Sequence, residues 1–244
     1  MSRYTSKNAK KSIAAGAVIV VSAVTFNQVR DSSHPAPEKS LRPLTYVAMG
    51  ASDVVGIGAD DPPNEAWVAR IFKRLPPGSK FHRLGVEGST VMQAAMEQLP
   101  VAEKAEADLV TVWLAVNDFT LNVPLDHYEH ALDWVVGRSS RGKGRLFLGN
   151  IPDLTSTPAY DDEPRDALKA RLDQYNSAIG RVAKRNDAVL VDLYGASQAV
   201  AGEAAELVAD DGFHPSSFGY QVLAEIFWNA ISEDPVTGPL VDSG

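Results

Sequence analysis

Two kinds of segment alternate along the chain. Five short apolar runs have the length and composition of buried strands, and they cover residues 44–49, 80–84, 108–115, 145–151 and 188–193. The run at 108–115, DLVTVWLA, is the clearest, because a strand covered on both faces is apolar with little alternation. Between the runs, apolar residues recur every three or four positions, which is typical of helices that pack on one side.

Helices are predicted from Pro62 onward, from an N-cap at Ser89 or Thr90, and over residues 126–136, 163–186 and 216–232. The longest of them carries one apolar stripe, made of Leu168, Leu172, Tyr175, Ile179 and Val182. Strand and helix alternate throughout, which predicts an α/β fold with a five-stranded parallel sheet and helices on both faces. In such sheets, functional groups gather at the carboxyl ends of the strands.

The first 26 residues have the layout of an export signal. Four basic residues precede an apolar run at 13–26, IAAGAVIVVSAVTF, and a polar, proline-bearing stretch follows it. The run is shorter than the ~20 residues that span a bilayer comfortably, and Val21-Ser22-Ala23 offers a cleavage site. We therefore expect an exported protein, extracellular or in the cell envelope. Residues 1–26 are either a cleaved signal peptide or a membrane anchor, with 13–26 as a possible tether.

The rest of the chain is expected to form a flexible linker at 27–43, one folded domain at 44–235 and a C-terminal tail at 236–244. All five basic residues before position 31 lack an acidic counterpart there, which leaves 18 basic against 31 acidic residues in 31–244, a net charge of −13. An acidic body repels phosphate backbones, so a nucleic-acid partner is not expected. The chain has no cysteine, which excludes disulfides, thiolate metal sites and a cysteine nucleophile.

Four short segments carry the candidate chemistry. Three of them directly follow the first three predicted strands, and the fourth lies before the last helix: Gly50–Asp53, Gly85–Gly88, Ala115–Asp118 and Asp211–Pro215. Acyl transfer needs a hydroxyl nucleophile, a base in hydrogen-bond reach, a group that orients the base, and donors for the oxyanion. Ser52 fits the nucleophile and His214 the base. Asp211, three residues earlier, fits the orienting group, while Ser52 and Gly88 N–H and the Asn117 amide fit the oxyanion donors.

These segments resemble the four motif blocks of the SGNH hydrolases, also called the GDSL-like lipase/acylhydrolase family. Gly50-Ala51-Ser52 stands where that family has Gly-Asp-Ser, and Asp211–Pro215 matches Asp-x-x-His-Pro in full. Ala115–Asp118 takes the place of Gly-x-Asn-Asp, and Leu84 takes the place of the asparagine ahead of the two glycines. The resemblance extends from Leu44 to Ile231.

The resemblance implies a three-layer α/β/α sandwich like that of flavodoxin, and hydrolysis of small-molecule acyl esters or thioesters without a metal or other cofactor. It implies a triad of Ser52, Asp211 and His214, with Ser52, Gly88 and Asn117 as oxyanion donors. The departures at Ala51, Asp53 and Ala115 bear on substrate preference. We expect Asp53 either to make the entrance polar or to raise the pKa of a neighbouring acid, and residues 119–124 and 153–164 to shape the pocket.

Two other functions use the same groups. An acyltransferase would pass the acyl group to an acceptor other than water, and a non-catalytic envelope protein would use the groove for binding only. His127 and His130 lack the order of a metalloprotease motif and are interpreted as a solvated helix face. The tryptophans at 67, 113, 134 and 228 are expected in the core. The sequence specifies no oligomeric state.

Overall fold

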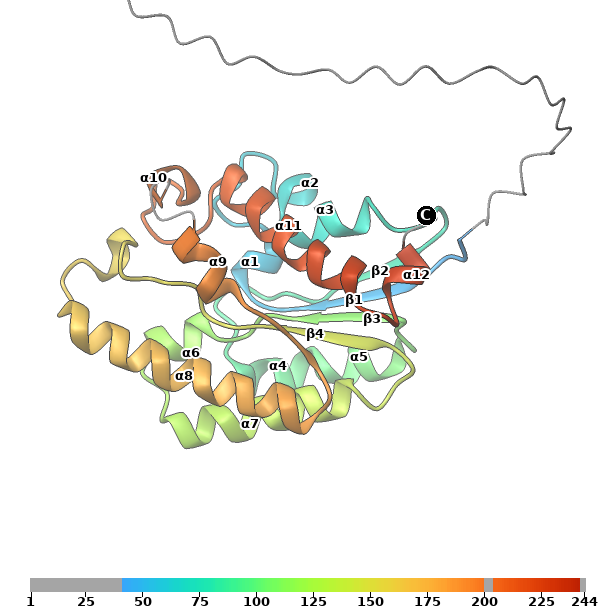
Figure 1. The fold of residues 1–244 in the computed structure, drawn as a ribbon, viewed down its shortest axis with the longest axis horizontal. Helices are drawn as coiled ribbons and strands as arrows, with labels where there is room; N and C mark the ends of the chain where they lie inside the picture. Colours follow the sequence, from blue (N-terminus) through green and yellow to red (C-terminus); the bar gives the residue numbers. More distant parts are fainter. Residues whose placement is uncertain (1–40, 200–203, 242–244) are drawn as a thin grey trace, which may run out of the picture. The chain divides into compact units, whose positions relative to one another are not determined.

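The computed structural model describes residues 41–199 and 204–241. Its centre is a sheet in the order β2-β1-β3-β4-β5, in which every neighbouring pair is parallel (Figure 1). The strands are β1 Thr45–Met49, β2 Lys80–Arg83, β3 Leu109–Val112, β4 Arg145–Gly149 and β5 Val189–Val191. This order is that of flavodoxin-like folds, and the predicted α/β class and five-stranded parallel sheet are confirmed.

Helices cover both faces of the sheet (Figure 1). One face carries α4 Val91–Glu97, α5 Leu99–Lys104, α7 Leu125–Ser139 and α8 Arg165–Arg185. The other carries α3 Trp67–Phe72, α11 Ser217–Glu233 and α12 Gly238–Val241. Shorter helices belong to the connections: α1 Ser52–Val55, α2 Pro62–Glu65, α6 Val116–Thr120, the 3₁₀ turn η1 Pro158–Tyr160, α9 Leu193–Ala199 and α10 Ala204–Leu207.

The two faces of the sheet build two apolar cores, because successive side chains of a strand point to opposite sides. In β1, Val47 and Met49 pack under α4, α5, α7 and α8. Tyr46 and Ala48 pack under α3 and α11. All four side chains are fully buried, as the apolar and scarcely alternating sequence of the strand predicts.

Local sequence signals set several helix boundaries where they were expected. Thr90 is the N-cap of α4, and it forms a capping box with Gln93 in which each side chain accepts from the other residue's backbone N–H. All five residues of the predicted stripe on α8 are buried. The three-layer sandwich therefore follows the amphipathic pattern of its helices.

Other segments differ from the sequence predictions. Ala66 has an extended backbone, φ −51° and ψ 141°, and divides the helix predicted from Pro62 into α2 and α3. Trp134 is not in the core: it is 55% exposed on the outer side of α7, and the Arg138 guanidinium lies 5.3 Å from its ring centre. Core helices can place an aromatic residue outside when a cation covers its face.

The described part of the predicted tail, residues 236–241, packs on the domain. The Thr237 hydroxyl donates to the Ile231 carbonyl, at 2.6 Å, and is buried with Val241 of α12. The predicted signal or anchor at 1–26, and most of the linker, lie outside the described residues. Within 41–199 and 204–241, no helix combines the length and the apolar character that a membrane crossing requires.

Candidate active site

The parallel sheet brings three of the predicted site residues to one edge. Ser52 begins α1 directly after β1, Gly88 lies in the loop after β2, and Asn117 belongs to α6 after β3. Carboxyl ends of adjacent parallel strands lie side by side, so residues far apart in sequence become neighbours. Asp211 and His214 come from the turn between α10 and α11 and approach the same edge.

The turn that carries Ser52 is buried and held by side chains. Ser52 itself is 7% exposed. The Asp53 carboxylate points inward, where Oδ1 accepts from Ala51 N–H at 2.9 Å and Oδ2 from Trp67 Nε1–H at 3.0 Å. Burial raises the pKa of Asp53 to about 6, against the lowering effect of these donors. Both carboxylate oxygens of Asp53 are thus occupied by donors of the protein, although the residue also lines the cavity beside Ser52.

The two glycines of the second segment, Gly85 and Gly88, are favoured at their positions for different physical reasons. A Cβ on Gly85 would lie 2.4 Å from Val54 Cβ and 2.8 Å from the Ala51 carbonyl oxygen, so no side chain fits against the Ser52 turn. Gly88 has φ +73°, a left-handed conformation that other residues rarely adopt. This conformation shapes the loop beside Ser52.

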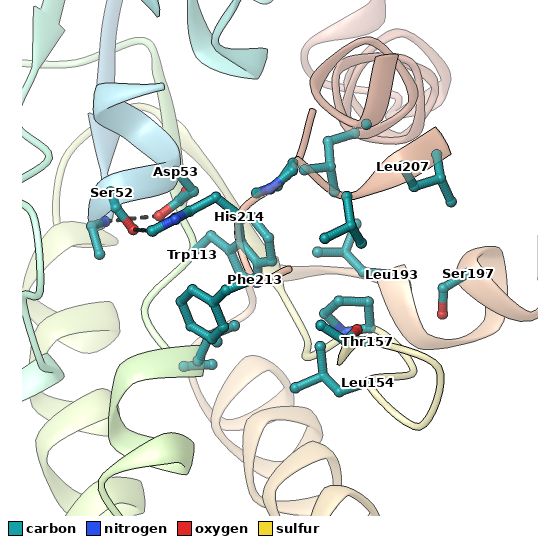
Figure 2. A pocket seen from close by; sticks show the side chains of 18 of the residues that line it. Ser52, Asp53, Trp113, Leu154, Thr157, Leu193, Ser197, Leu207, Phe213 and His214 are labelled. Carbon is teal, nitrogen blue, oxygen red and sulfur yellow. Dashed lines mark hydrogen bonds between the residues drawn. The ribbon is translucent and has the colours of Figure 1, made fainter. Parts of the chain in front are cut away.

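Ser52, His214 and Asp211 form a hydrogen-bonded series. His214 Nε2 lies 3.1 Å from Ser52 Oγ (Figure 2), and His214 Nδ1 lies 2.6 Å from Asp211 Oδ2. The other carboxylate oxygen of Asp211 accepts from the backbone N–H groups of Phe213 and His214, each at 2.9 Å. Burial alone would raise the pKa of Asp211, but the His214 side chain and these two N–H groups outweigh it and lower the pKa.

Two of the predicted oxyanion donors, Ser52 and Asn117, line one cavity, and Gly88 precedes Ser89, which also lines it. Within the described ranges, no acceptor engages Ser52 N–H or Gly88 N–H. The Asn117 amide nitrogen donates to the Ser89 carbonyl at 3.0 Å. A primary amide has two N–H donors, so this bond fixes the side chain and leaves its second N–H available.

A cavity of about 170 Å³ opens beside Ser52. Figure 2 shows Ser52 and Asp53 at one end, and Leu207, Leu193 and Ser197 at the other. The wall away from Ser52 is mostly apolar and comes from α9, α10, the residue after α10, and α11: Leu193, Leu207, Val208, Val222, Leu223 and Ile226. Of the two loops expected to shape the pocket, 153–164 contributes its first residues, whereas 119–124 contributes none of the lining.

Polar residues that the sequence did not single out support the site from behind. Gln98, at the end of α4, is 2% exposed and bonds to the backbone of Gly50. Asp118 Oδ2 accepts from Val91 N–H at 2.9 Å, and burial raises the pKa of Asp118 to about 6. The Asn-Asp pair in the third segment was the available signal for Asp118, whereas Gln98 had none.

The two histidines that are close in sequence, His127 and His130, lie away from the cavity. His127 and His130 are exposed on α7, as expected for a solvated helix face. In the part of the chain that the structure describes, no three side chains of histidine, aspartate or glutamate are grouped to hold a metal ion.

The fold is similar to those of several solved hydrolase structures. An α/β hydrolase from the metagenome of Lake Arreo, Spain, is 25% identical, with a TM-score of 0.63 and coverage of 82% of this chain and 97% of that one. An acetylxylan esterase from Geobacillus stearothermophilus is 20% identical, with a TM-score of 0.65 and coverage of 80% and 97%. The psychrotrophic esterase EstA from Pseudoalteromonas sp. is 17% identical, with a TM-score of 0.62 and coverage of 78% and 97%. No curated protein sequence matches the chain.

The sequence profile of the GDSL-like Lipase/Acylhydrolase family matches residues 48–222, which is more than half of the 244-residue chain. The fold and the profile define the class of protein, a serine ester hydrolase. The chain belongs to the GDSL-like lipase/acylhydrolase family, and the resemblance inferred from its four segments is confirmed.

Proposed function

We propose that the protein hydrolyses carboxylic esters with an apolar acyl group, through an acyl-enzyme on Ser52. The observation that carries the proposal is the series Asp211–His214–Ser52, with hydrogen-bond distances of 2.6 and 3.1 Å. A serine hydroxyl is a weak nucleophile by itself, and an adjacent imidazole activates it.

In the first half of the reaction, Ser52 Oγ bonds to the ester carbonyl carbon while His214 Nε2 takes the hydroxyl proton. Asp211 holds the proton on Nδ1 and stabilises the imidazolium. The tetrahedral intermediate then collapses, the ester C–O bond breaks, and His214 gives its proton to the leaving alcohol. In the second half, a water molecule attacks the acyl carbon while His214 takes its proton. The bond from that carbon to Ser52 Oγ then breaks, His214 returns the proton to Ser52, and the carboxylic acid is released.

Negative charge develops on the carbonyl oxygen in both tetrahedral intermediates. The proposed donors are Ser52 N–H, Gly88 N–H and the second N–H of the Asn117 amide. Donors that are already in place at the start of the reaction need no reorganisation, and loss of one typically reduces turnover on the order of 10²–10³-fold. The hydrogen bond from Asn117 to the Ser89 carbonyl supports this role, because it fixes the amide in orientation.

The acyl group is assigned to the apolar end of the cavity. Its wall consists mostly of leucine, valine and isoleucine side chains, which offer no partner to a sugar hydroxyl or a charged headgroup. Ser52, Asn117 and His214 lie at the end where the ester itself must bind. Polar residues at 153–157 and Ser197 also line the cavity, but the Ser197 hydroxyl is already engaged by Asp153 N–H and the Tyr194 carbonyl. The predominance of apolar side chains favours an apolar acyl chain longer than acetate as the substrate group that determines selectivity.

The proposal is tested with purified protein and p-nitrophenyl esters from acetate to palmitate, alongside Ser52→Ala. We expect an intermediate chain to give the highest kcat/KM, and the variant to lose all activity above background. Equal activity of Ser52→Ala would contradict the nucleophile, and a maximum at acetate would contradict the acyl assignment. A competing alcohol in the assay separates hydrolysis from transfer, because a transferase would yield the new ester.

A further inference from the structure

Gln98 has an unusual position for an uncharged polar side chain. It lies between α4 and α5 and is almost completely buried, at 2% exposure. Burial of a primary amide is unfavourable unless its hydrogen bonds are replaced. A methionine side chain would fill a similar volume without that cost. Packing therefore does not explain why an amide stands here.

The amide binds both backbone groups of one residue. Gly50 N–H donates to Gln98 Oε1 at 3.1 Å, and Gln98 Nε2 donates to the Gly50 carbonyl at 2.8 Å. Gly50 is the first residue after β1 and lies two positions before Ser52. Gln98 thus continues the hydrogen bonding of the sheet beyond the end of β1, at the start of the turn that carries the nucleophile.

The same side chain also reaches the loop that carries Gly88. Gln98 Nε2 lies 3.3 Å from Ser89 Oγ, and α4, which ends next to Gln98, begins directly after this loop. The Ser52 turn and the Gly88 loop also share a backbone hydrogen bond, from Val86 N–H to the Gly50 carbonyl. At 3.4 Å it is longer than the bonds between Gln98 and Gly50. The Gln98 amide therefore supplies shorter hydrogen bonds between α4 and the Ser52 turn.

From this geometry we infer that Gln98 is a positioning residue, which holds the Gly88 loop at a fixed separation from the Ser52 turn. The inference rests on the proposed function, since Ser52 N–H and Gly88 N–H are the proposed oxyanion donors. Such donors act within about 2.7–3.1 Å of the oxyanion. A small shift of the loop relative to the turn therefore reduces the stabilisation of the transition state much more than it reduces the affinity for the substrate.

Two substitutions test the inference, with Gln93→Glu on the same helix as a matched control. Gln98→Met keeps the volume and removes the amide, and we expect kcat to fall about tenfold or more with KM changed less than about twofold. Gln98→Glu is nearly isosteric. When protonated, its carboxyl group presents one acceptor and one donor to Gly50, as the amide does, and when ionised it has no donor.

The ratio of kcat for Gln98→Glu to kcat for wild type should therefore fall as pH rises from about 5 to about 8, while the ratio for Gln93→Glu stays level. Each kcat is referred to the folded fraction measured by circular dichroism. A folded Gln98→Met with wild-type kcat overturns the inference. If that variant does not fold, a level ratio for Gln98→Glu overturns it. Inactive wild type, or active Ser52→Ala, contradicts the proposed function instead.

Discussion

The two halves of the catalytic site are built in different ways. The Ser52 turn is buried, and side chains from distant parts of the chain hold it: Asp53 with Trp67 on one side, and Gln98 on the other. The Asp211–His214 turn lies at the surface, with the Asp211 side chain 44% exposed. Its carboxylate is held by hydrogen bonds within its own four residues.

This difference indicates which contacts position the catalytic atoms accurately. Atoms of the Ser52 half must match a developing charge within tenths of an ångström, and long-range contacts in the core provide that accuracy. His214 exchanges a proton with atoms about 3 Å away, which requires less accurate positioning, so a short local turn is sufficient to hold it. Substitutions in the exposed half should therefore affect activity alone, while substitutions in the buried half should affect activity and stability together.

The largest effect is expected in the exposed half. His214→Gln removes the proposed base, and kcat should fall on the order of 10⁴-fold or more. The midpoint of thermal unfolding should remain within a few degrees of wild type, because the backbone hydrogen bonds that close the turn on the Asp211 carboxylate do not involve the ring. Steady-state kinetics and calorimetry measure both. A large drop in unfolding temperature would break the comparison, since it would make the turn part of the structural frame.

The second effect concerns the buried half. Asn117→Ala removes a proposed oxyanion donor and the bond to the Ser89 carbonyl, so kcat should fall on the order of 10²–10³-fold. Stability should fall as well, by about 1 kcal/mol. Asn64→Ala, at an exposed position of α2, is the matched control and should change neither. Full activity of Asn117→Ala in ester hydrolysis would remove the amide from the mechanism.

A third substitution tests the wall of the cavity, which belongs to neither half. Val222→Phe narrows the apolar end of the cavity. The kcat/KM for long-chain esters should fall about tenfold relative to acetate, since a pocket discriminates by roughly 1–3 kcal/mol per methylene. Val236→Phe adds the same ring at an exposed valine and should leave the dependence of kcat/KM on acyl chain length unchanged. An unaltered chain-length preference in Val222→Phe would place the acyl group elsewhere.

The smallest effect is on the pH dependence of stability. Burial raises the pKa of Asp53 from its ordinary 3.8 to about 6, so between these pH values the folded state binds more protons than the unfolded state. Stability from this group is then fully present below about pH 4, is lost as pH rises to about 6, and is constant above. Asp53→Asn should flatten this decline in the stability measured by urea unfolding, leaving the part that comes from Asp118, whose pKa burial also raises to about 6. Identical slopes in both proteins would exclude a raised pKa at Asp53.

The sequence predicted the position of the site because its signals are local. Ser52, Gly88 and Asn117 each follow an apolar strand, and parallel strands bring such positions to one edge whatever the length of the helices between them. Asp211 and His214 are three residues apart, so a single turn places them together. The alternation of strands and helices was likewise sufficient for the order of layers, although it could not show the break at Ala66.

Features that depend on packing between distant segments were not predictable in this way. Gln98 contacts Gly50 across 48 positions of sequence, and a glutamine on a short helix is ordinarily a surface residue. The inward direction of Asp53 depends on Trp67, which the interruption after α2 places opposite it. The cavity wall depends on how α9, α10 and α11 meet, and the periodicity of each helix says only which of its sides is apolar.

Both described chain ends lie at the sheet edge opposite Ser52. Arg42 pairs with Asp108, just before β3, and Asp234, between α11 and α12, pairs with Arg145 at the start of β4. A fusion partner, an affinity resin or a solid support attached beyond either end would therefore leave the mouth of the cavity open to substrate. The same arrangement suits the domain to display on a particle or a cell, and to circular permutation, since the two ends approach each other away from the chemistry.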